Sequence, residues 1–394
     1  MSLQAKTLEK SYLETTEPPL QPNAETSKLE ILPKFTTRCP IKSYNGWDPL
    51  EEVIVGRLEG ATVPPAHPSV TFTLPKLSGR ILRLFSGHRY PRYLYHAAQK
   101  QLLAFIEILI AEGIKVRRPD VLNGRKPIIH PTWKNRGFCT ACPRDGFLVV
   151  GNEIIETPMA WRSRFFEGYA YRSLFKEYFS QGARWTAAPR PELLDELFDK
   201  SYSPPLEGEP MRYLLTEFEP VFDAADFIRC GRDIFAMRSN VTNLSGIEWL
   251  QRHLGDTYRI HTLEFRCRTP MHIDSSFMPL APGKLLVNPD YLDVAKLPPM
   301  FKSWDIIIAP RPVIPKGMLF KFASMTSAWI SLNVLMLDEE RVIVEQDQVP
   351  LIKELKKYGF KPIPCKFADY LPFGGAFHCA TLDVRRTGEL QSYF

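Results

Sequence analysis

A strand–strand–helix–strand pattern that recurs along the chain constrains the fold of this sequence more than any other feature. Four apolar hairpins are predicted, and their turns lie at Gly151-Asn152, Gly231-Arg232-Asp233, Pro282-Gly283-Lys284 and Asp338-Glu339-Glu340. A helical segment and one more strand follow each hairpin, with the helices predicted over 165–182, 246–254, 295–304 and 349–358. A unit of this kind cannot bury its apolar face alone, so the units must pack against one another.

The two ends of the chain supply a fifth unit. A strand over 51–56 precedes a helix over 93–113 and a strand over 115–119, but it has no hairpin partner. The last strand, 378–384, also has no partner after it. Pairing these two strands would close a ring and remove the open sheet edges. We therefore predict that residues 39–394 form one five-fold pseudosymmetric α/β propeller of ββαβ units.

Residues 1–38 differ from the rest of the chain. They are rich in Pro, Ser and Thr, carry balanced charges and contain few large apolar residues. A secretory signal needs an apolar central region, and a transit peptide is rich in Arg and poor in acidic residues, so neither fits. We predict a flexible leader and a cytoplasmic protein. No apolar run approaches the roughly 18 residues of a membrane helix, so no membrane partner is expected.

Two local patterns have more than one interpretation. Basic and aromatic residues alternate between residues 60 and 106, where acidic residues are missing until Glu107. Such a segment binds nucleic acid, forms a solvated loop, or attracts an anionic substrate. The net charge of only +6 favours the last two, so no nucleic-acid partner is predicted. Cys139 and Cys142 have the spacing of a zinc or redox site, but no second pair completes it, and a metal is not predicted.

Three short strings contain residues that could carry chemistry. Cys379 follows Gly374-Gly375 closely, and it is either a nucleophile or a small residue of the core. His378 would point to the opposite face of a strand, which indicates a structural role. In the second string, His272 and Asp274 would share one face of a strand, as an acid/base beside a fixed anion or as an ordinary surface pair.

The third string places Asp223 among apolar residues, where an unpaired carboxylate is costly and a histidine is a natural partner. Asp226 competes with it for this role, and Asp145 is a further carboxylate in an apolar context. Several carboxylates around one thiol suggest a planar, cationic substrate, because a guanidinium presents paired N–H donors to carboxylates. No phosphate-binding, dinucleotide or zinc-protease motif is present.

These strings, in this order, resemble the amidinotransferase family, which includes the glycine and inosamine-phosphate amidinotransferases. The resemblance covers about nine-tenths of the chain and rests on segments 47–56, 143–145, 161–167, 222–226, 271–274 and 377–386. It implies the pentein-like five-fold α/β propeller, in agreement with the five predicted units. It also implies one catalytic domain over 39–394 and favours a homodimer.

The resemblance implies a role for each matching residue. Cys379 corresponds to the nucleophile, His272 to the general acid/base and Asp223 to its partner. Asp145 and Asp274 correspond to residues that hold the guanidinium, while the remaining substrate-binding positions are Met271, Thr326, Ser327 and Tyr291. The implied reaction moves the amidino group of L-arginine onto the cysteine and then to an acceptor amine, with release of L-ornithine. No metal or organic cofactor is implied, and the bound guanidinium and a charged histidine would favour the thiolate.

Two departures from the glycine enzymes bear on the substrates. Tyr291 stands where those enzymes have an arginine for the donor carboxylate, and Thr269-Pro270-Met271 replaces an Asn-Pro-Met loop near the acceptor. We therefore expect a larger acceptor amine from a specialised pathway of the saxitoxin type. The alternatives are an L-arginine:glycine amidinotransferase and an arginine hydrolase or deiminase on the same fold.

Overall fold

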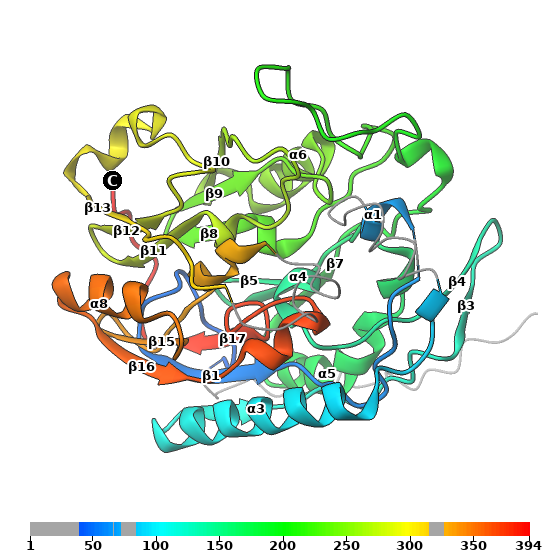
Figure 1. The fold of residues 1–394 in the computed structure, drawn as a ribbon, viewed down its shortest axis with the longest axis horizontal. Coiled ribbons are helices and arrows are strands. Elements are labelled where there is room, and N and C mark those ends of the chain that lie inside the picture. The colour runs from blue at the N-terminus through cyan, green and yellow to red at the C-terminus, as the bar shows by residue number, and fades with distance from the viewer. Residues whose placement is uncertain (1–38, 66, 72–83, 315–326) are drawn as a thin grey trace, which may run out of the picture. The chain divides into compact units, whose positions relative to one another are not determined.

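Five three-stranded sheets form the framework of the described residues, which are 39–65, 67–71, 84–314 and 327–394 of a computed structural model (Figure 1). The predicted leader, 1–38, lies outside the described residues. The strands are β1 Leu50–Val55, β2 Lys115–Arg117, β3 Pro127–Ile129, β4 Lys134–Arg136, β5 Phe147–Val150, β6 Glu153–Glu156, β7 Arg184–Ala187, β8 Phe227–Cys230, β9 Asp233–Met237, β10 Arg259–Leu263, β11 Phe277–Ala281, β12 Lys284–Val287, β13 Asp305–Ile308, β14 Leu335–Met336, β15 Arg341–Glu345, β16 Lys361–Cys365 and β17 Thr381–Arg386.

Each sheet has one antiparallel and one parallel pairing around its middle strand. The β5–β6, β8–β9, β11–β12 and β14–β15 pairs are antiparallel, which confirms the four predicted hairpins. The strands β7, β10, β13 and β16 then join the second strand of each hairpin in parallel. A parallel neighbour requires a crossover connection, and in each unit this connection contains the helical segment.

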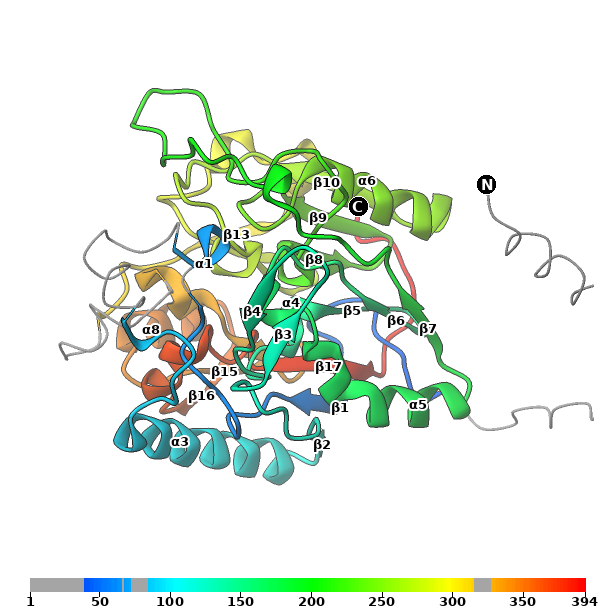
Figure 2. The ribbon, with the colours of Figure 1, turned by 90° about the vertical axis from the view of Figure 1, so that its right-hand side faces the viewer.

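The α-helices are α1 Pro68–Thr71, α3 Arg92–Ala111, α4 Pro143–Gly146, α5 Arg172–Ser180, α6 Leu244–Leu254 and α8 Val349–Lys357. Short 3₁₀ helices occupy many connections: η1 Arg162–Arg164, η2 Glu167–Tyr171, η3 Asp195–Leu197, η4 Ala224–Asp226, η5 Gly255–Thr257, η6 Ile273–Ser275, η7 Val294–Lys296, η8 Pro299–Ser303, η9 Ala328–Leu332 and η10 Ala368–Phe373. Both views show α3 and α5 along the same side of the ring as β1 (Figures 1 and 2).

The ring closes where the two ends of the described chain meet. Strand β1 pairs antiparallel with β17 and parallel with β2, so the fifth sheet combines the first and last strands. Figure 1 shows β1 and β17 side by side, with α3 beside them. The predicted closure is confirmed, and the chain folds as a five-fold α/β propeller.

Two predicted helices are wrong in detail. Over 295–304 the chain forms η7 and η8 instead of one α-helix, because Pro298 and Pro299 lack the backbone N–H groups that a continuous helix needs. Over 165–182 the regular α-helix begins only at Arg172, after the 3₁₀ turns of η2. The buried Glu167 carboxylate, at the start of η2, accepts a hydrogen bond from Nε of Arg164.

A buried cluster of ions joins the sheets near the centre of the ring. Asp383 on β17 is fully buried and is paired with Arg144 at 2.5 Å, Arg229 at 2.7 Å and Arg386 at 2.9 Å. These three guanidinium groups hold the pKa of Asp383 well below its usual value, although burial alone would raise it. Because Arg144 precedes Asp145 in α4, this cluster also fixes the position of the neighbouring carboxylate.

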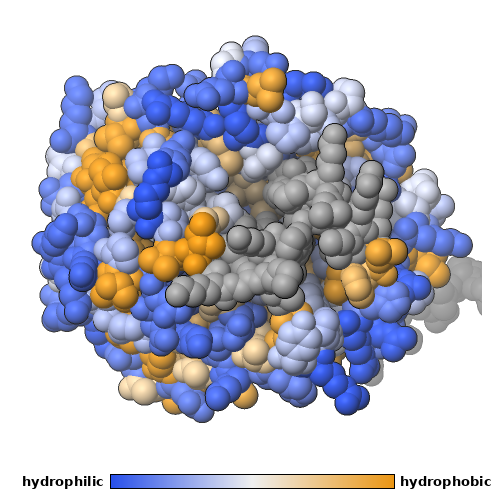
Figure 3. Space-filling view, in the orientation of Figure 1, coloured by the Kyte–Doolittle hydropathy of each residue, from blue (hydrophilic) through white to orange (hydrophobic). Residues whose placement is uncertain are grey.

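Hydrophilic residues cover most of the face drawn in Figure 3, and hydrophobic residues occur there in small groups. No helix among the described residues has the length and apolar character that crossing a membrane requires.

Candidate active site

Cys379 lies in the turn between η10 and β17 and is 1% exposed. Its backbone N–H donates to Oδ1 of Asn333 at 3.0 Å, and Nδ2 of Asn333 lies 3.1 Å from Sγ. Gly375 passes so close that a Cβ there would lie 2.3 Å from Cβ of Cys379. The asparagine and the glycine therefore fix the direction of the thiol.

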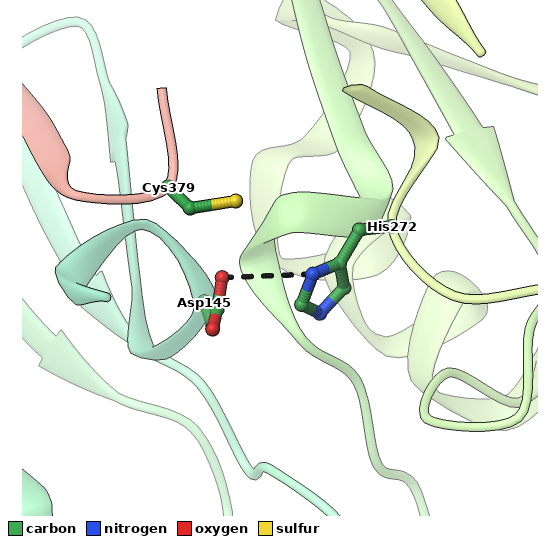
Figure 4. A group of neighbouring side chains, drawn as sticks. All are labelled: Asp145, His272 and Cys379. Atoms are coloured by element: carbon green, nitrogen blue, oxygen red, sulfur yellow. Dashed lines mark ion pairs between the residues drawn. The ribbon is translucent and has the colours of Figure 1, made fainter. Parts of the chain in front are cut away.

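His272 lies in the connection before η6, with a backbone φ of +60°. The predicted strand over 271–274 is therefore wrong, because a strand requires negative φ. The predicted proximity of His272 and Asp274 still holds, since both line the same cavity. Asp145, His272 and Cys379 point toward one another from α4, this connection and the turn before β17 (Figure 4).

Two carboxylates keep His272 protonated. Nε2 lies 3.0 Å from Oδ2 of Asp223, and Nδ1 lies 3.7 Å from Oδ1 of Asp145. Burial alone lowers the pKa of His272, but these two carboxylates outweigh it and hold that pKa well above its ordinary value. The imidazolium is therefore available as a proton donor beside the thiol.

Asp223, and not Asp226, contacts this histidine. Oδ2 of Asp223 also accepts a hydrogen bond from Nε1 of Trp161 at 2.8 Å. Asp226 instead accepts from the hydroxyls of Ser239 at 2.6 Å and Thr242 at 2.5 Å. Burial raises the pKa of Asp226 to about 7, so near neutral pH this carboxyl group is only partly ionised. The geometry therefore favours Asp223 as the partner of His272.

Asp145 and Asp274 flank the thiol, and in each carboxylate one oxygen takes part in a hydrogen bond. Oδ2 of Asp145 accepts from Arg164 at 2.6 Å, while Oδ2 of Asp274 lies 2.7 Å from His378 and 3.6 Å from Sγ of Cys379. Their Oδ1 atoms are buried and have no hydrogen-bond partner among the described residues. A buried carboxylate oxygen without a donor is costly, so these two oxygens mark where a ligand would place N–H groups.

The ligand-free site opposes ionisation of the thiol. Burial and the Asp274 and Asp145 carboxylates raise the pKa of Cys379 to about 12, although the His272 contact lowers it. A neutral thiol is a weak nucleophile, so an added positive charge in the site would make Cys379 more reactive. A bound cation between the two carboxylates would supply that charge.

The cavity above these residues has a volume of about 120 Å³. Met271, Tyr291 and Ser327 line it as predicted, whereas Thr326 lies outside the described residues. Burial raises the pKa of Tyr291 to about 12 although a hydrogen bond with Ser327 opposes the shift, so its hydroxyl is a neutral donor. Among the described lining residues there is no lysine or arginine.

Other residues of the site were not predicted. Asn333 contacts Cys379 and also donates to Oδ2 of Asp274 at 2.7 Å, and its only sequence signal is a polar residue directly before the apolar run 334–337. Arg164 connects Asp145 to Glu167 beneath the site. His378 contacts Asp274, but His378 and Cys379 lie in the turn before β17, so the predicted strand over 378–384 begins only at Thr381.

One group of side chains here could also hold a metal ion. Ligand atoms of Asp145, His272 and Cys379 all lie within 4.8 Å of one another. Carboxylate, imidazole and thiolate are ligands that Zn²⁺ accepts. By contrast, the Cys139 and Cys142 sulfurs each lie 3.7 Å from the carbonyl oxygen of Phe373, and no comparable ligand group includes them among the described residues.

No protein-family model matches the chain, but individual proteins match it closely. The L-arginine:L-lysine amidinotransferase of Pseudomonas savastanoi pv. phaseolicola is 49% identical over 365 residues, which cover 93% of this chain and 99% of that protein. The chain belongs to the amidinotransferase family. Among solved structures, the amidinotransferase of the saxitoxin biosynthetic pathway from Microseira wollei is 57% identical, with a TM-score of 0.87 over 90% of this chain and 100% of that one.

A more distant member supports the same conclusion. The inosamine-phosphate amidinotransferase of Streptomyces griseus is 38% identical, with a TM-score of 0.81, and covers 90% of this chain and 99% of that one. The amidinotransferase fold, the propeller and the family resemblance predicted above are thus confirmed. The individual roles of Cys379, His272 and Asp223 remain predictions.

Proposed function

We propose that this amidinotransferase moves the amidino group of L-arginine through a covalent amidino-cysteine on Cys379 to an acceptor amine, and releases L-ornithine. The observation that carries the proposal is that Asp145 and Asp274 flank Sγ of Cys379 and that each has a buried Oδ1 atom without a hydrogen-bond partner among the described residues. A guanidinium is planar, carries positive charge and has N–H donors for two carboxylates at once. Its central carbon would then face the thiol.

In the first half-reaction the donor guanidinium offsets the charge of Asp145 and Asp274 and lowers the pKa of the thiol. Cys379 releases its proton to solvent as the donor binds, and its sulfur attacks the guanidinium carbon. The bond from that carbon to the ornithine nitrogen breaks, and His272 donates its proton to this nitrogen. Asp223 fixes the ring of His272 in the orientation for this transfer, through the 3.0 Å contact.

In the second half-reaction ornithine leaves and the acceptor amine enters. His272, now neutral, takes a proton from this amine while the nitrogen attacks the amidino carbon. The carbon–sulfur bond breaks and the thiolate returns. The amine leaves with the amidino group, so the kinetics are of the ping-pong type. None of these steps uses a metal or an organic cofactor.

The acceptor is proposed to be a larger amine of a specialised pathway of the saxitoxin type. Tyr291 in the cavity wall presents a neutral hydroxyl, and Thr269-Pro270-Met271 forms another part of that wall. The two amidinotransferases with 49% and 57% identity are named for lysine and for the saxitoxin pathway, not for glycine. These names support an acceptor larger than glycine.

Mass spectrometry of the intact protein tests this proposal. The protein is mixed with L-arginine alone and is then exposed to glycine, lysine or larger diamines in separate reactions. We expect one added amidino group on Cys379, none on Cys379→Ala, and the fastest discharge by a larger amine. Guanidinoacetate as the best product would replace the large-amine proposal with the glycine alternative.

Water in place of the acceptor distinguishes the hydrolase alternative. Citrulline, or urea together with ornithine, formed from arginine and water alone at the rate of ornithine release with amines would establish a hydrolase. We also propose a homodimeric, cytoplasmic enzyme whose catalytic domain spans residues 39–394. Light scattering on the purified protein measures its oligomeric state, and a monomer would refute the proposed homodimer.

A further inference from the structure

A second cysteine, Cys142, lies next to Cys379 on the far side of Gly375. A Cβ built on Gly375 would lie 2.8 Å from Sγ of Cys379 and 3.4 Å from Sγ of Cys142. The two sulfur atoms therefore border the same small space, and their separation is at most the sum of these distances. Because residue 375 is a glycine, no side chain of that residue stands between the two thiols.

The surroundings of the two sulfurs differ. Cys379 lines the active-site cavity, as does Gly374, but Cys142 is not among the described lining residues, and both cysteines are buried. A small oxidant in the cavity therefore meets Cys379 first.

We propose that Cys142 is a resolving cysteine that captures oxidised Cys379 in a reversible disulfide and so protects the active-site thiol. Hydrogen peroxide is the co-reactant. The Cys379 sulfur attacks one peroxide oxygen, an S–O bond forms and the O–O bond breaks. The departing hydroxide takes the Cys379 proton and leaves as water, and the sulfenic acid is the oxidised product. The Cys142 sulfur then attacks Sγ of Cys379, the S–S bond forms, and the S–O bond breaks.

The departing hydroxide takes the Cys142 proton and leaves as water, so two thiols and one peroxide give one disulfide and two waters. Formation of the S–S bond requires the sulfurs to move to about 2.05 Å. Gly374, with a φ of +114°, and Gly375 lie in the segment that must adjust. Two consecutive glycines allow that adjustment because they lack Cβ atoms. A dithiol reductant restores both thiols.

Cys139 provides the matched control. It has the same side chain, is also buried, and its sulfur lies 3.7 Å from the same carbonyl oxygen of Phe373 as that of Cys142. A Cβ atom built on Gly374 or on Gly375 has Sγ of Cys142, and not Sγ of Cys139, among its nearest neighbours. If proximity across Gly375 decides the partner, only Cys142 can resolve Cys379.

The experiment treats the full chain with hydrogen peroxide in a chelating buffer, blocks free thiols, and maps disulfide-linked peptides by mass spectrometry. We expect a product about 2 Da lighter than the reduced protein, with Cys142 linked to Cys379. Cys139→Ser should form the same link. Cys142→Ser should instead accumulate sulfinic acid on Cys379, and after dithiothreitol it should regain a roughly tenfold smaller share of its own starting activity than the wild type.

The peptide map of the wild type tests the inference even if Cys142→Ser does not fold. A Cys139–Cys379 link, or oxygen added to Cys379 with no link, would overturn the inference. Equal recovery of the wild type and Cys142→Ser would also overturn it. Because the map requires no turnover, failure of this inference is separate from failure of the proposed amidino transfer.

Discussion

Replacing Asp223 by Asn tests whether the buried carboxylate sets the charge and orientation of His272. The substitution keeps the shape of the side chain but removes its charge, at a position that is 0% exposed. Oδ2 of Asp223 lies 3.0 Å from Nε2 of His272 and accepts from Nε1 of Trp161 at 2.8 Å. Because both contacts are made to the same oxygen, an asparagine oxygen in that place can still accept from the tryptophan and the histidine, but it lacks the negative charge of the carboxylate.

The magnitude follows from that contact. A hydrogen bond to a buried charged group contributes about 1.5–3 kcal/mol, which corresponds to a roughly 10- to 150-fold loss of kcat/KM where the bond acts in the transition state. Loss of the carboxylate charge also lowers the pKa of His272, because Asp223 is one of the groups that raise it.

The sign of the pH effect follows from the raised pKa of His272. The protonated form that donates to ornithine is present below this pKa and is lost as the pH rises through it. Removing Asp223 lowers the pKa, so the high-pH limb of ornithine release must move to lower pH. The assay measures ornithine release from arginine plus the best acceptor across about pH 6–10.

Asp226→Asn is the matched control, because Asp226 is equally buried but bonds to Ser239 and Thr242 instead of His272. It should change kcat/KM less than about threefold and leave the high-pH limb in place. Wild-type rate and an unmoved limb in Asp223→Asn would refute the assignment of Asp223. Equal losses in both variants would show that general destabilisation, and not the histidine contact, causes the effect.

Three further predictions follow from particular contacts. Gly375→Ala places a Cβ 2.3 Å from Cβ of Cys379, so amidino-enzyme formation should fall more than about 100-fold in a chain that still melts cooperatively; an unchanged rate would contradict the packing argument. Asn333→Ala removes the donor to Sγ of Cys379 and to Asp274 and should slow formation of the adduct by about 10- to 100-fold, measured in single turnovers against Ser331→Ala. Asp383→Asn leaves three buried guanidinium groups without their shared anion and should lower the free energy of unfolding, measured with urea, by about 3–5 kcal/mol. Because the pKa of Asp383 is depressed in the folded state, this stabilisation is present above about pH 4 and decreases as the pH falls further. A difference between wild type and variant that does not change with pH in acid would contradict this prediction.

Much of the fold could be predicted because hairpins have local signals. Gly151 and Gly231 both adopt positive φ at the predicted turns, and the flanking apolar runs form the paired strands. The pairing of β1 with β17 was predictable because a ring leaves no open edge. The helix over 295–304 failed because apolar spacing was given more weight than Pro298 and Pro299.

The site was predictable only as a set of residue types. The chemistry of Cys379, His272 and Asp223 could be inferred from the strings, but their distances depend on three connections far apart in the chain. The positive φ of His272 has no sequence signal, because nothing in 271–274 distinguishes a strand from a tight turn. Asn333 was missed for a similar reason, since one polar residue before an apolar strand is common.

The balance of charge in the site explains why such a fold would select a guanidinium substrate. Burial, together with Asp274 and Asp145, raises the pKa of Cys379 to about 12, so the carboxylates that we propose bind the substrate also keep the free thiol protonated. A neutral ligand such as citrulline would leave the pKa of Cys379 raised, whereas a guanidinium would lower that pKa and bring its own carbon to the sulfur. The same electrostatic interaction would then bind the guanidinium and activate the thiol. Since a bound cation favours the thiolate, selectivity for a guanidinium donor would arise before any bond forms.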